Sequence, residues 1–189
     1  MKTQITDNSE VTIDTMVKGY DELEPSLLAM SIIRPGSRVL SAGCGAGREV
    51  DHLVNKLKCE VVAVDIDRRV LIMSEHKTPN AKYICGNIVD MKFEEKFDYV
   101  VCLWNTMNYL DKKAKKMFVE TSYENLKEDG ELIIATTHIF SHWRHFPCNI
   151  KHRKHFHHFP WEINGWFKDT KFKLSKVRIG ATIVLFARK

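Results

Sequence analysis

Short apolar runs rich in β-branched residues alternate with longer, more polar stretches along most of the chain. Runs of this length, bounded by turn-forming residues, are typical of strands that are buried on both faces of a sheet. They cover 37–42, 59–65, 81–86, 97–104 and 130–137, and two more follow at 173–180 and 181–189. Between the first five lie stretches of helical length, of which 48–57, 68–76 and 112–126 are the clearest.

The order of these elements predicts an α/β fold. Strands that alternate with helices and are joined by right-handed crossovers build a doubly wound, Rossmann-like sheet. The last two runs flank Gly180, so we expect them to close the sheet as an antiparallel hairpin. The prediction is a single domain over residues 1–189, with a seven-stranded, mostly parallel sheet and an antiparallel C-terminal strand.

Composition is that of an ordinary globular protein, with 44% hydrophobic and 28% charged residues. No apolar run approaches the ~20 residues that a membrane span needs, and the polar first ten residues lack the apolar core of a secretory signal. The five cysteines are scattered and none stands in a CxxC pair. We therefore expect a cytoplasmic protein with reduced thiols, no disulfides and no membrane contact.

The net charge of +5 conceals an asymmetry. Residues 138–189 contain 11 Lys and Arg against 2 Asp and Glu, whereas the preceding 137 residues contain 18 against 22. Seven of the nine histidines lie between positions 138 and 158. A slightly acidic body thus carries a basic, histidine-rich segment, 138–161, directly after the fifth predicted strand.

The stretch VLSAGCGAGRE, residues 39–49, places three glycines at alternate positions after the first predicted strand. Glycines there let a ligand approach the backbone at the carboxyl end of a parallel strand. The spacing is not that of a dinucleotide fingerprint, which needs a glycine where Arg48 stands, and the Gly-Lys-Ser/Thr of a phosphate loop is absent. The loop therefore serves a different ligand.

Asp65 ends the second predicted strand, 22 residues beyond Gly43. A carboxylate at this place can accept both ribose hydroxyls of an adenosine-containing ligand. The alternative is that Asp65 caps the next helix, but Asp67 is better placed for that role. We therefore favour the ribose role for Asp65.

Five segments together resemble the successive motifs of class I S-adenosylmethionine-dependent methyltransferases. They are the glycine loop 39–49, the acidic strand end at Asp65, CGNIVDM at 85–91, FDYVVCLWNTMNYL at 97–110 and LKEDGELIIATT at 126–137. They occur in the family's order and at its spacing over roughly residues 15–189. One glycine loop alone would be a weak signal, whereas five ordered motifs are a strong one.

The resemblance implies that S-adenosylmethionine is the cofactor, and it assigns roles to the matching positions. By this resemblance Asp65 binds the ribose, and the adenine is contacted by Ile66, Asn87 and Ile88, with the Asn87 amide oxygen accepting from the adenine amino group. Core packing is the alternative for both isoleucines, and filling of a cleft wall is the alternative for Trp104. The methionine and sulfonium part, including the methyl group, lies along Ala42, Gly43, Cys44, Gly45, Gly47, Leu103, Trp104 and Asn105.

The fourth motif bears on the substrate. Methyltransferases that modify planar nitrogens of bases or glutamine often carry Asn/Asp-Pro-Pro-Tyr/Phe there, whereas this chain has WNTMNY at 104–109. The motif resembles the small-molecule branch of the family and counts against DNA adenine methylation. Asn105, Asn108 and Tyr109 are candidates for orienting a polar substrate, although Asn108 and Tyr109 could equally cap the next helix.

The basic segment 138–161 stands where this family often builds a substrate lid. One hypothesis is an anion-selecting lid, with Arg144 and His145 among its charge-assisted contacts. A second is an RNA-binding surface, because aromatic residues interleave the basic ones, and a third is a metal site formed by histidines and Cys148. The last alternative is a solvated loop with a few aromatic anchors.

The amphipathic segment 12–31, broken by Pro25, is expected to cover the same cleft from the other side, with Tyr20 over the cofactor. His138 and His142 are the candidates for a general base, since histidine titrates near neutral pH. No resident metal is expected. The interpretation is a methyltransferase, monomeric or homodimeric, that acts on an O or N atom of a small polar or anionic metabolite. The alternatives are an RNA-modifying methyltransferase and a non-catalytic cofactor-binding module.

Overall fold

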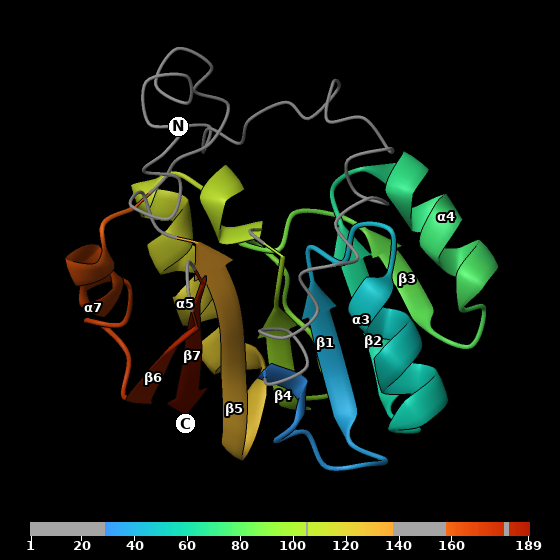
Figure 1. The fold of residues 1–189 in the computed structure, drawn as a ribbon, viewed down its shortest axis with the longest axis horizontal. Helices are drawn as coiled ribbons and strands as arrows, with labels where there is room; N and C mark the ends of the chain where they lie inside the picture. The colour runs from blue at the N-terminus through green and yellow to red at the C-terminus, as the bar shows by residue number, and fades with distance from the viewer. Residues whose placement is uncertain (1–28, 105, 138–157, 180–181) are drawn as a thin grey trace.

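The computed structural model describes residues 29–104, 106–137, 158–179 and 182–189. Seven strands form one sheet in the order β3-β2-β1-β4-β5-β7-β6 (Figure 1). The strands are β1 (Arg38–Ala42), β2 (Glu60–Asp65), β3 (Lys82–Cys85), β4 (Phe97–Cys102), β5 (Leu126–Thr137), β6 (Lys173–Ile179) and β7 (Thr182–Arg188). The helical segments are α3 (Arg48–Asp51), η2 (His52–Lys56), α4 (Arg68–Lys77), η3 (Thr106–Tyr109), α5 (Lys112–Asn125), η5 (Pro160–Glu162) and α7 (Ile163–Trp166).

The sheet confirms the predicted fold class. The first five strands pair in parallel, and β7 pairs antiparallel with both β5 and β6. The predicted closing hairpin is therefore present, with Ile179 opposite Thr182. Because β1, β2, β3 and β4 are parallel, the loops that follow them all leave from the same edge of the sheet.

Side chains that alternate along the strands form two apolar cores, one on each face of the sheet. On one face, residues such as Leu40, Val100 and Ile134 pack with Phe118 of α5 and with Trp166 of α7. The other core joins Val39, Ala63, Val101 and Ile133 to Leu53 of η2 and Leu71 of α4. Figure 1 shows these helices on the two sides of the sheet. Burial on both faces explains why the strands appear as continuous apolar runs in the sequence.

Most predicted elements differ from the structure by a residue or two at their ends, and three differences are notable. The helix expected over 48–57 is a short α3 continued by the wider turn η2, in which Leu57 N–H bonds to the His52 carbonyl at 3.1 Å. The fifth strand begins at Leu126 rather than at 130, because Leu126 pairs with Phe97 before a register shift in the ladder. The fourth strand ends at Cys102 rather than at 104, so Trp104 belongs to the loop that follows it.

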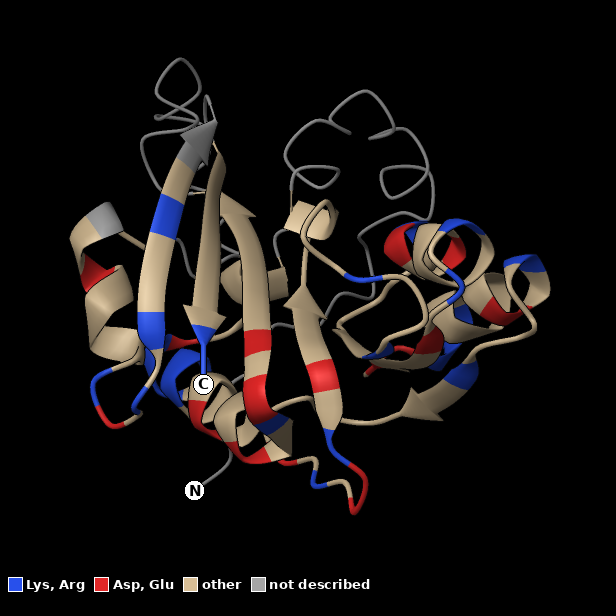
Figure 2. Ribbon diagram, turned by 90° about the horizontal axis from the view of Figure 1, so that it is seen from below, with Lys and Arg blue, Asp and Glu red and all other residues tan. Residues whose placement is uncertain are grey.

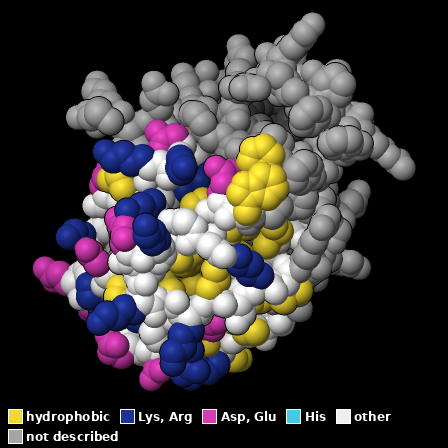
Figure 3. Space-filling view, turned by 90° about the vertical axis from the view of Figure 1, so that its left-hand side faces the viewer, with side chains coloured by type: hydrophobic (Ala, Val, Ile, Leu, Met, Phe, Trp, Pro, Cys, Tyr) yellow, Lys and Arg dark blue, Asp and Glu magenta, His cyan; other side chains and the backbone are white. Residues whose placement is uncertain are grey.

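Charged residues lie mainly on helices, loops and strand ends, while the strands carry few (Figure 2). The edge strand β6 is an exception and contributes Lys173 and Lys176. Figure 3 shows acidic, basic and hydrophobic side chains intermixed on the face that carries α7 and β6. Within the described ranges, no helix is both long enough and apolar enough to cross a membrane.

Candidate functional site

The three glycines of the loop between β1 and α3 all adopt left-handed backbone angles, with φ of 72° at Gly43, 51° at Gly45 and 76° at Gly47. A Cβ at Gly43 would lie 2.3 Å from Thr106 Cγ2, and one at Gly47 would lie 1.9 Å from Ser74 Oγ. A Cβ at Gly45 would meet no described atom within 4 Å. Two of the glycines are thus required by the packing of the protein itself, and only Gly45 borders open space.

Asp65 ties this loop to the end of β2. Its Oδ2 accepts from the Gly45 N–H at 2.8 Å and its Oδ1 accepts from the Asp67 N–H at 2.9 Å. The Gly43 and Cys44 N–H groups both bond to the carbonyl of Val64, the preceding residue of β2. Burial raises the pKa of Asp65, while the bonds from Asp67 and Gly45 lower it. Each carboxylate oxygen retains accepting capacity beyond its one backbone bond.

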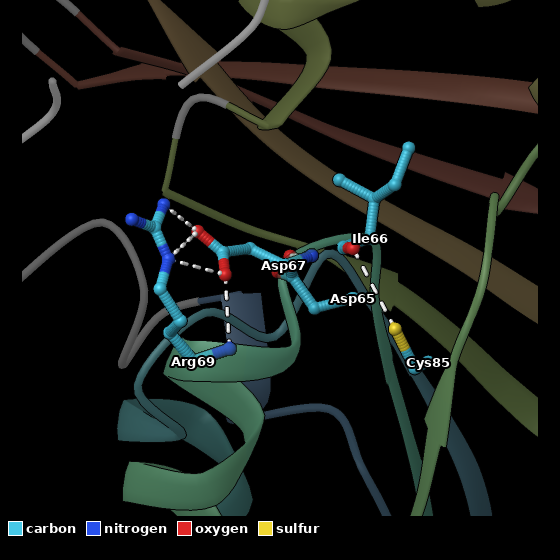
Figure 4. Close-up of polar contacts among 5 residues, drawn as sticks. All are labelled: Asp65, Ile66, Asp67, Arg69 and Cys85. Atoms are coloured by element: carbon cyan, nitrogen blue, oxygen red, sulfur yellow. Dashed lines mark hydrogen bonds and ion pairs between the residues drawn. The ribbon is translucent and has the colours of Figure 1, made fainter. Parts of the chain in front are cut away.

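Asp67 is the cap of α4, so the capping alternative for Asp65 is wrong. The Asp67 carboxylate accepts from the Arg69 N–H at 2.9 Å and also binds the Arg69 guanidinium group (Figure 4). The Arg69 contact holds the pKa of Asp67 below its ordinary value. Ile66, between the two acids, points away from this polar cluster and is 54% exposed (Figure 4).

The loop after β3 carries Asn87 and Ile88. The Asn87 amide oxygen accepts from the Val89 N–H at 3.2 Å, and its amide nitrogen donates to Asp90 Oδ2 at 3.1 Å. Ile88 is partly buried against the core. The Asn87 side chain therefore closes a tight turn in this conformation, and its predicted contact with adenine stays a prediction.

Trp104 follows β4 and lies close to the glycine loop. Its backbone is left-handed, with φ of 57°, and its neighbour Leu103 is 2% exposed. The indole Nε1–H donates to Glu49 Oε2 at 3.1 Å, and the Arg48 guanidinium lies 4.9 Å from the ring centroid. Trp104 is therefore held from two sides by the first two residues of α3.

Glu49 is a site residue that the sequence reasoning did not identify. It is 2% exposed, and its Oε1 accepts from the Ser41 hydroxyl of β1 at 2.6 Å. Burial raises the pKa of Glu49 to about 7, although the bonds from Ser41 and Trp104 oppose the rise. The available signal was its spacing, because Glu49 lies four positions before the buried Leu53 and so shares the inner face of the helix.

Asn108 and Tyr109 lie in η3. Asn108 is 2% exposed, its amide nitrogen donates to Thr137 Oγ1 at 2.9 Å, and its amide oxygen accepts from the Thr136 hydroxyl at 3.3 Å. The capping alternative for this pair is wrong, since Asp111 caps α5 through the Ala114 N–H at 2.7 Å. Their role toward substrate stays a prediction.

The remaining predicted residues, Tyr20, Asn105, His138, His142, Arg144 and His145, lie outside the described residues. So do the segment 138–157 and all but the end of 12–31. Cys44, Cys59, Cys85 and Cys102 are free thiols, and no cluster of metal-ligating side chains occurs in the described part of the chain.

The described residues form a row along one edge of the sheet, running from Trp104 after β4, past Gly45 after β1 and Asp65 with Ile66 at β2, to Asn87 after β3. The row offers open space at a glycine, a half-buried carboxylate and an exposed apolar side chain. An elongated ligand with a polar sugar between an apolar ring and a compact head group matches this order. Such ligands bind outside the carboxyl ends of strands in open α/β sheets.

Comparison with known proteins finds methyltransferases and a carboxy-S-adenosyl-L-methionine synthase among the matches. A family model described as a methyltransferase domain matches residues 39–130. The chain is 32% identical over 101 residues to an uncharacterized methyltransferase of Staphylococcus carnosus, covering 53% of this chain and 47% of that protein. It is 25% identical over 134 residues to the carboxy-S-adenosyl-L-methionine synthase of Shigella boydii, covering 65% of this chain and 53% of that protein. The chain thus spans about half the length of the curated relatives it matches.

Solved structures share the fold at low sequence identity. A TehB-like SAM-dependent methyltransferase from Corynebacterium glutamicum superposes with a TM-score of 0.66 at 16% identity, covering 93% of this chain and 99% of that chain. The N-methyltransferase NodS of Bradyrhizobium japonicum, solved with S-adenosyl-L-homocysteine, gives 0.65 at 15% identity, covering 88% and 84%. These similarities confirm the predicted class I methyltransferase fold.

Proposed function

Because residues 39–130 form a methyltransferase domain on the class I fold, we propose that the chain is an S-adenosylmethionine-dependent methyltransferase. The observation that carries the proposal is the contact between Asp65 and Gly45, 2.8 Å long, beside the open space of the loop. It joins a carboxylate suited to a ribose to a backbone that a ligand can approach closely. The fold and the family match together support methyl transfer more strongly than the glycine loop alone or Asp65 alone does.

The residues present fit the cofactor. Asp65 accepts the ribose hydroxyls with the oxygen capacity that its two backbone bonds leave unused. Ile66, exposed to 54%, covers one face of the adenine, and Ile88 packs on the other side. Asn87 lies near the adenine amino group, and the loop from Ala42 to Gly47 borders the methionine part. Leu103, Trp104, Asn105 and Tyr20 complete the wall.

When bound, the cofactor supplies an electrophilic methyl group that is transferred by in-line displacement. The residues of the chain have to orient the acceptor at about 3 Å from that methyl group and exclude water. Tyr109 and Asn105 orient the acceptor from the β4 side, and Arg144 and His145 bind its polar or anionic group. Asn108 holds η3 against the end of β5. His138 or His142 removes a proton where the acceptor arrives protonated.

We assign the acceptor to small polar or anionic metabolites, with methylation at O or N. The absence of prolines in WNTMNY and the basic segment 138–161 both support this class. One observation favours the alternative of an RNA substrate. Phe159 and Trp161, at the end of the basic segment, stack with centroids 4.5 Å apart, and Trp161 is 66% exposed. An exposed aromatic ring beside positive charge is the kind of surface on which bases stack.

The test of the proposal is a calorimetric titration with S-adenosylhomocysteine. We expect micromolar binding by the wild type and at least a tenfold loss in Asp65→Asn, because the new amide nitrogen faces the N–H donors of Gly45 and Asp67. Asp67→Asn is the matched control, since asparagine caps a helix as well as aspartate does. No binding by folded wild type would exclude the methyltransferase proposal. A steep salt dependence of oligonucleotide binding would favour the RNA alternative.

A further inference from the structure

Three segments meet at the buried side chain of Glu49. They are β1 through Ser41, the glycine loop that directly precedes α3, and the residues after β4 through Trp104. We infer that Glu49 is a positioning residue that, as the carboxylate, holds the indole and the strained backbone of Trp104 against the glycine loop. The consequence for the cofactor rests on the proposed function, whereas the holding of Trp104 does not.

The geometry uses both carboxylate oxygens. Oε1 accepts from the Ser41 hydroxyl at 2.6 Å and Oε2 accepts from the Trp104 indole N–H at 3.1 Å. A carboxylate accepts from both groups, and its charge makes both hydrogen bonds stronger, whereas a protonated carboxyl or an amide donates to Ser41, whose hydroxyl then turns to accept. The ionised form of Glu49 therefore holds the indole more strongly than the neutral form does.

Trp104 needs such support. A bulky residue with φ of 57° is in a sparsely populated region, which costs about 1–3 kcal/mol and persists only where the surroundings over-determine it. Besides packing against the apolar core, Trp104 makes two interactions with consecutive residues: the hydrogen bond to Glu49 and the contact of the Arg48 guanidinium with the ring, 4.9 Å from the centroid. Of these interactions among the described residues, the bond to Glu49 is the one that fixes the direction of the indole N–H.

The position of Trp104 also reaches the glycine loop. The Thr106 hydroxyl, two residues beyond Trp104, lies 3.1 Å from the carbonyl oxygens of both Gly43 and Leu103, so it links the glycine loop to the residue that precedes Trp104. A Cβ at Gly43 would collide with this same threonine, which indicates how closely the two segments pack. A shift of Trp104 is therefore transmitted to the place where we expect the methionine part of the cofactor.

The groups that face Glu49 make its charge state sensitive to pH. Asp65 of β2 disfavours a second negative charge nearby, and burial acts in the same direction. The thiols of Cys44 and Cys102 stay neutral because burial raises the pKa of each far above the physiological range. Arg48, the cation next to Glu49 in the chain, has its guanidinium over the Trp104 ring.

The test follows Trp104 by fluorescence in the free protein. The chain has four tryptophans, so the spectrum of Trp104→Phe is subtracted from that of the wild type to isolate Trp104. We expect a step in its emission with a midpoint near pH 7 in the wild type, and no step in Glu49→Gln. Glu75→Gln is the matched control, because it neutralises an exposed glutamate of α4 and should keep the step.

A second readout is the affinity for S-adenosylhomocysteine, measured at pH 8 and pH 6. We expect wild-type affinity to fall about tenfold at pH 6, and Glu49→Gln to have the weak affinity at both values. Absence of the fluorescence step, its survival in Glu49→Gln, or equal affinities of the wild type and this variant at pH 8 would each overturn the inference. A Glu49-dependent step in a wild type that binds no S-adenosylhomocysteine would instead support the inference and overturn the proposed function.

Discussion

Replacing Glu49 by glutamine makes the stability of the protein depend differently on pH. Burial raises the pKa of Glu49 from 4.5 to about 7 in the folded protein, so between these values the folded state binds a proton that the unfolded state has lost. Stability then falls as pH rises through this window and stays lower above it. Glutamine does not titrate, so Glu49→Gln lacks this fall.

The size of the effect follows from the pKa difference. One pKa unit corresponds to about 1.4 kcal/mol, so a rise from 4.5 to about 7 represents about 3 kcal/mol. The variant also suffers a pH-independent loss of about 1 kcal/mol, because a neutral amide makes weaker hydrogen bonds to Ser41 and Trp104 than a carboxylate does. Only the change between two pH values isolates the ionisation of Glu49 from this loss.

The assay is urea unfolding of both proteins at pH 4.5 and pH 8. We expect the free energy of unfolding of Glu49→Gln, minus that of wild type, to be about 3 kcal/mol higher at pH 8 than at pH 4.5. The m-values should be unchanged. Asp65, whose pKa is also raised by burial, titrates in both proteins and largely cancels. Parallel stability curves for the two proteins across this range would refute the reasoning.

Three further predictions concern other parts of the protein. Gly47→Ala should lower the free energy of unfolding by about 2 kcal/mol or more, because its Cβ would lie 1.9 Å from Ser74 Oγ at a left-handed φ. Gly45→Ala should lower the free energy of unfolding by only about 1 kcal/mol, and its main effect should be a reduced affinity for S-adenosylhomocysteine. Asn108→Ala should lower the free energy of unfolding by about 2 kcal/mol in urea unfolding, since it removes the buried hydrogen bonds of the Asn108 amide to Thr136 and Thr137 at the end of β5. Burial lowers the pKa of Lys115 from 10.5 to about 8, so Lys115→Met should remove the gain in stability that wild type shows between pH 8 and pH 10.

The fold could be predicted from the sequence because the central parallel strands β1, β2 and β4 are buried on both faces and therefore form continuous apolar runs. The position of Asp65 could be predicted for a similar reason, since an acid that ends a parallel strand lies at the carboxyl edge of the sheet. For Glu49, the spacing from Leu53 indicated only the inner face of the helix, and its contact with Trp104 could not be predicted because that partner lies 55 residues away. The same limit applied to Asn108, whose partners come from β5.

The glycines show that the reason given for a predicted loop can be incomplete. All three were expected to make room for a ligand, yet Gly43 and Gly47 are required by Thr106 and Ser74 of the same chain. A pattern of glycines indicates that some group lies close to the backbone, but it does not distinguish a ligand from another part of the chain. Only Gly45 borders open space, so only there does the ligand explanation stand apart from packing.

Several features that cost stability lie at the edge of the sheet where the parallel strands end, although left-handed residues also occur elsewhere, at Lys58 and Asp129. They include three left-handed glycines, a tryptophan with φ of 57° and a glutamate whose ionisation is disfavoured by burial. None of these lies within a strand of the sheet. Strain and buried charge that persist together are expected where geometry serves a ligand rather than the fold. If this edge were only scaffold, Glu49→Gln would change stability alone; a parallel change in Trp104 emission and cofactor affinity would show that the cost maintains a binding geometry.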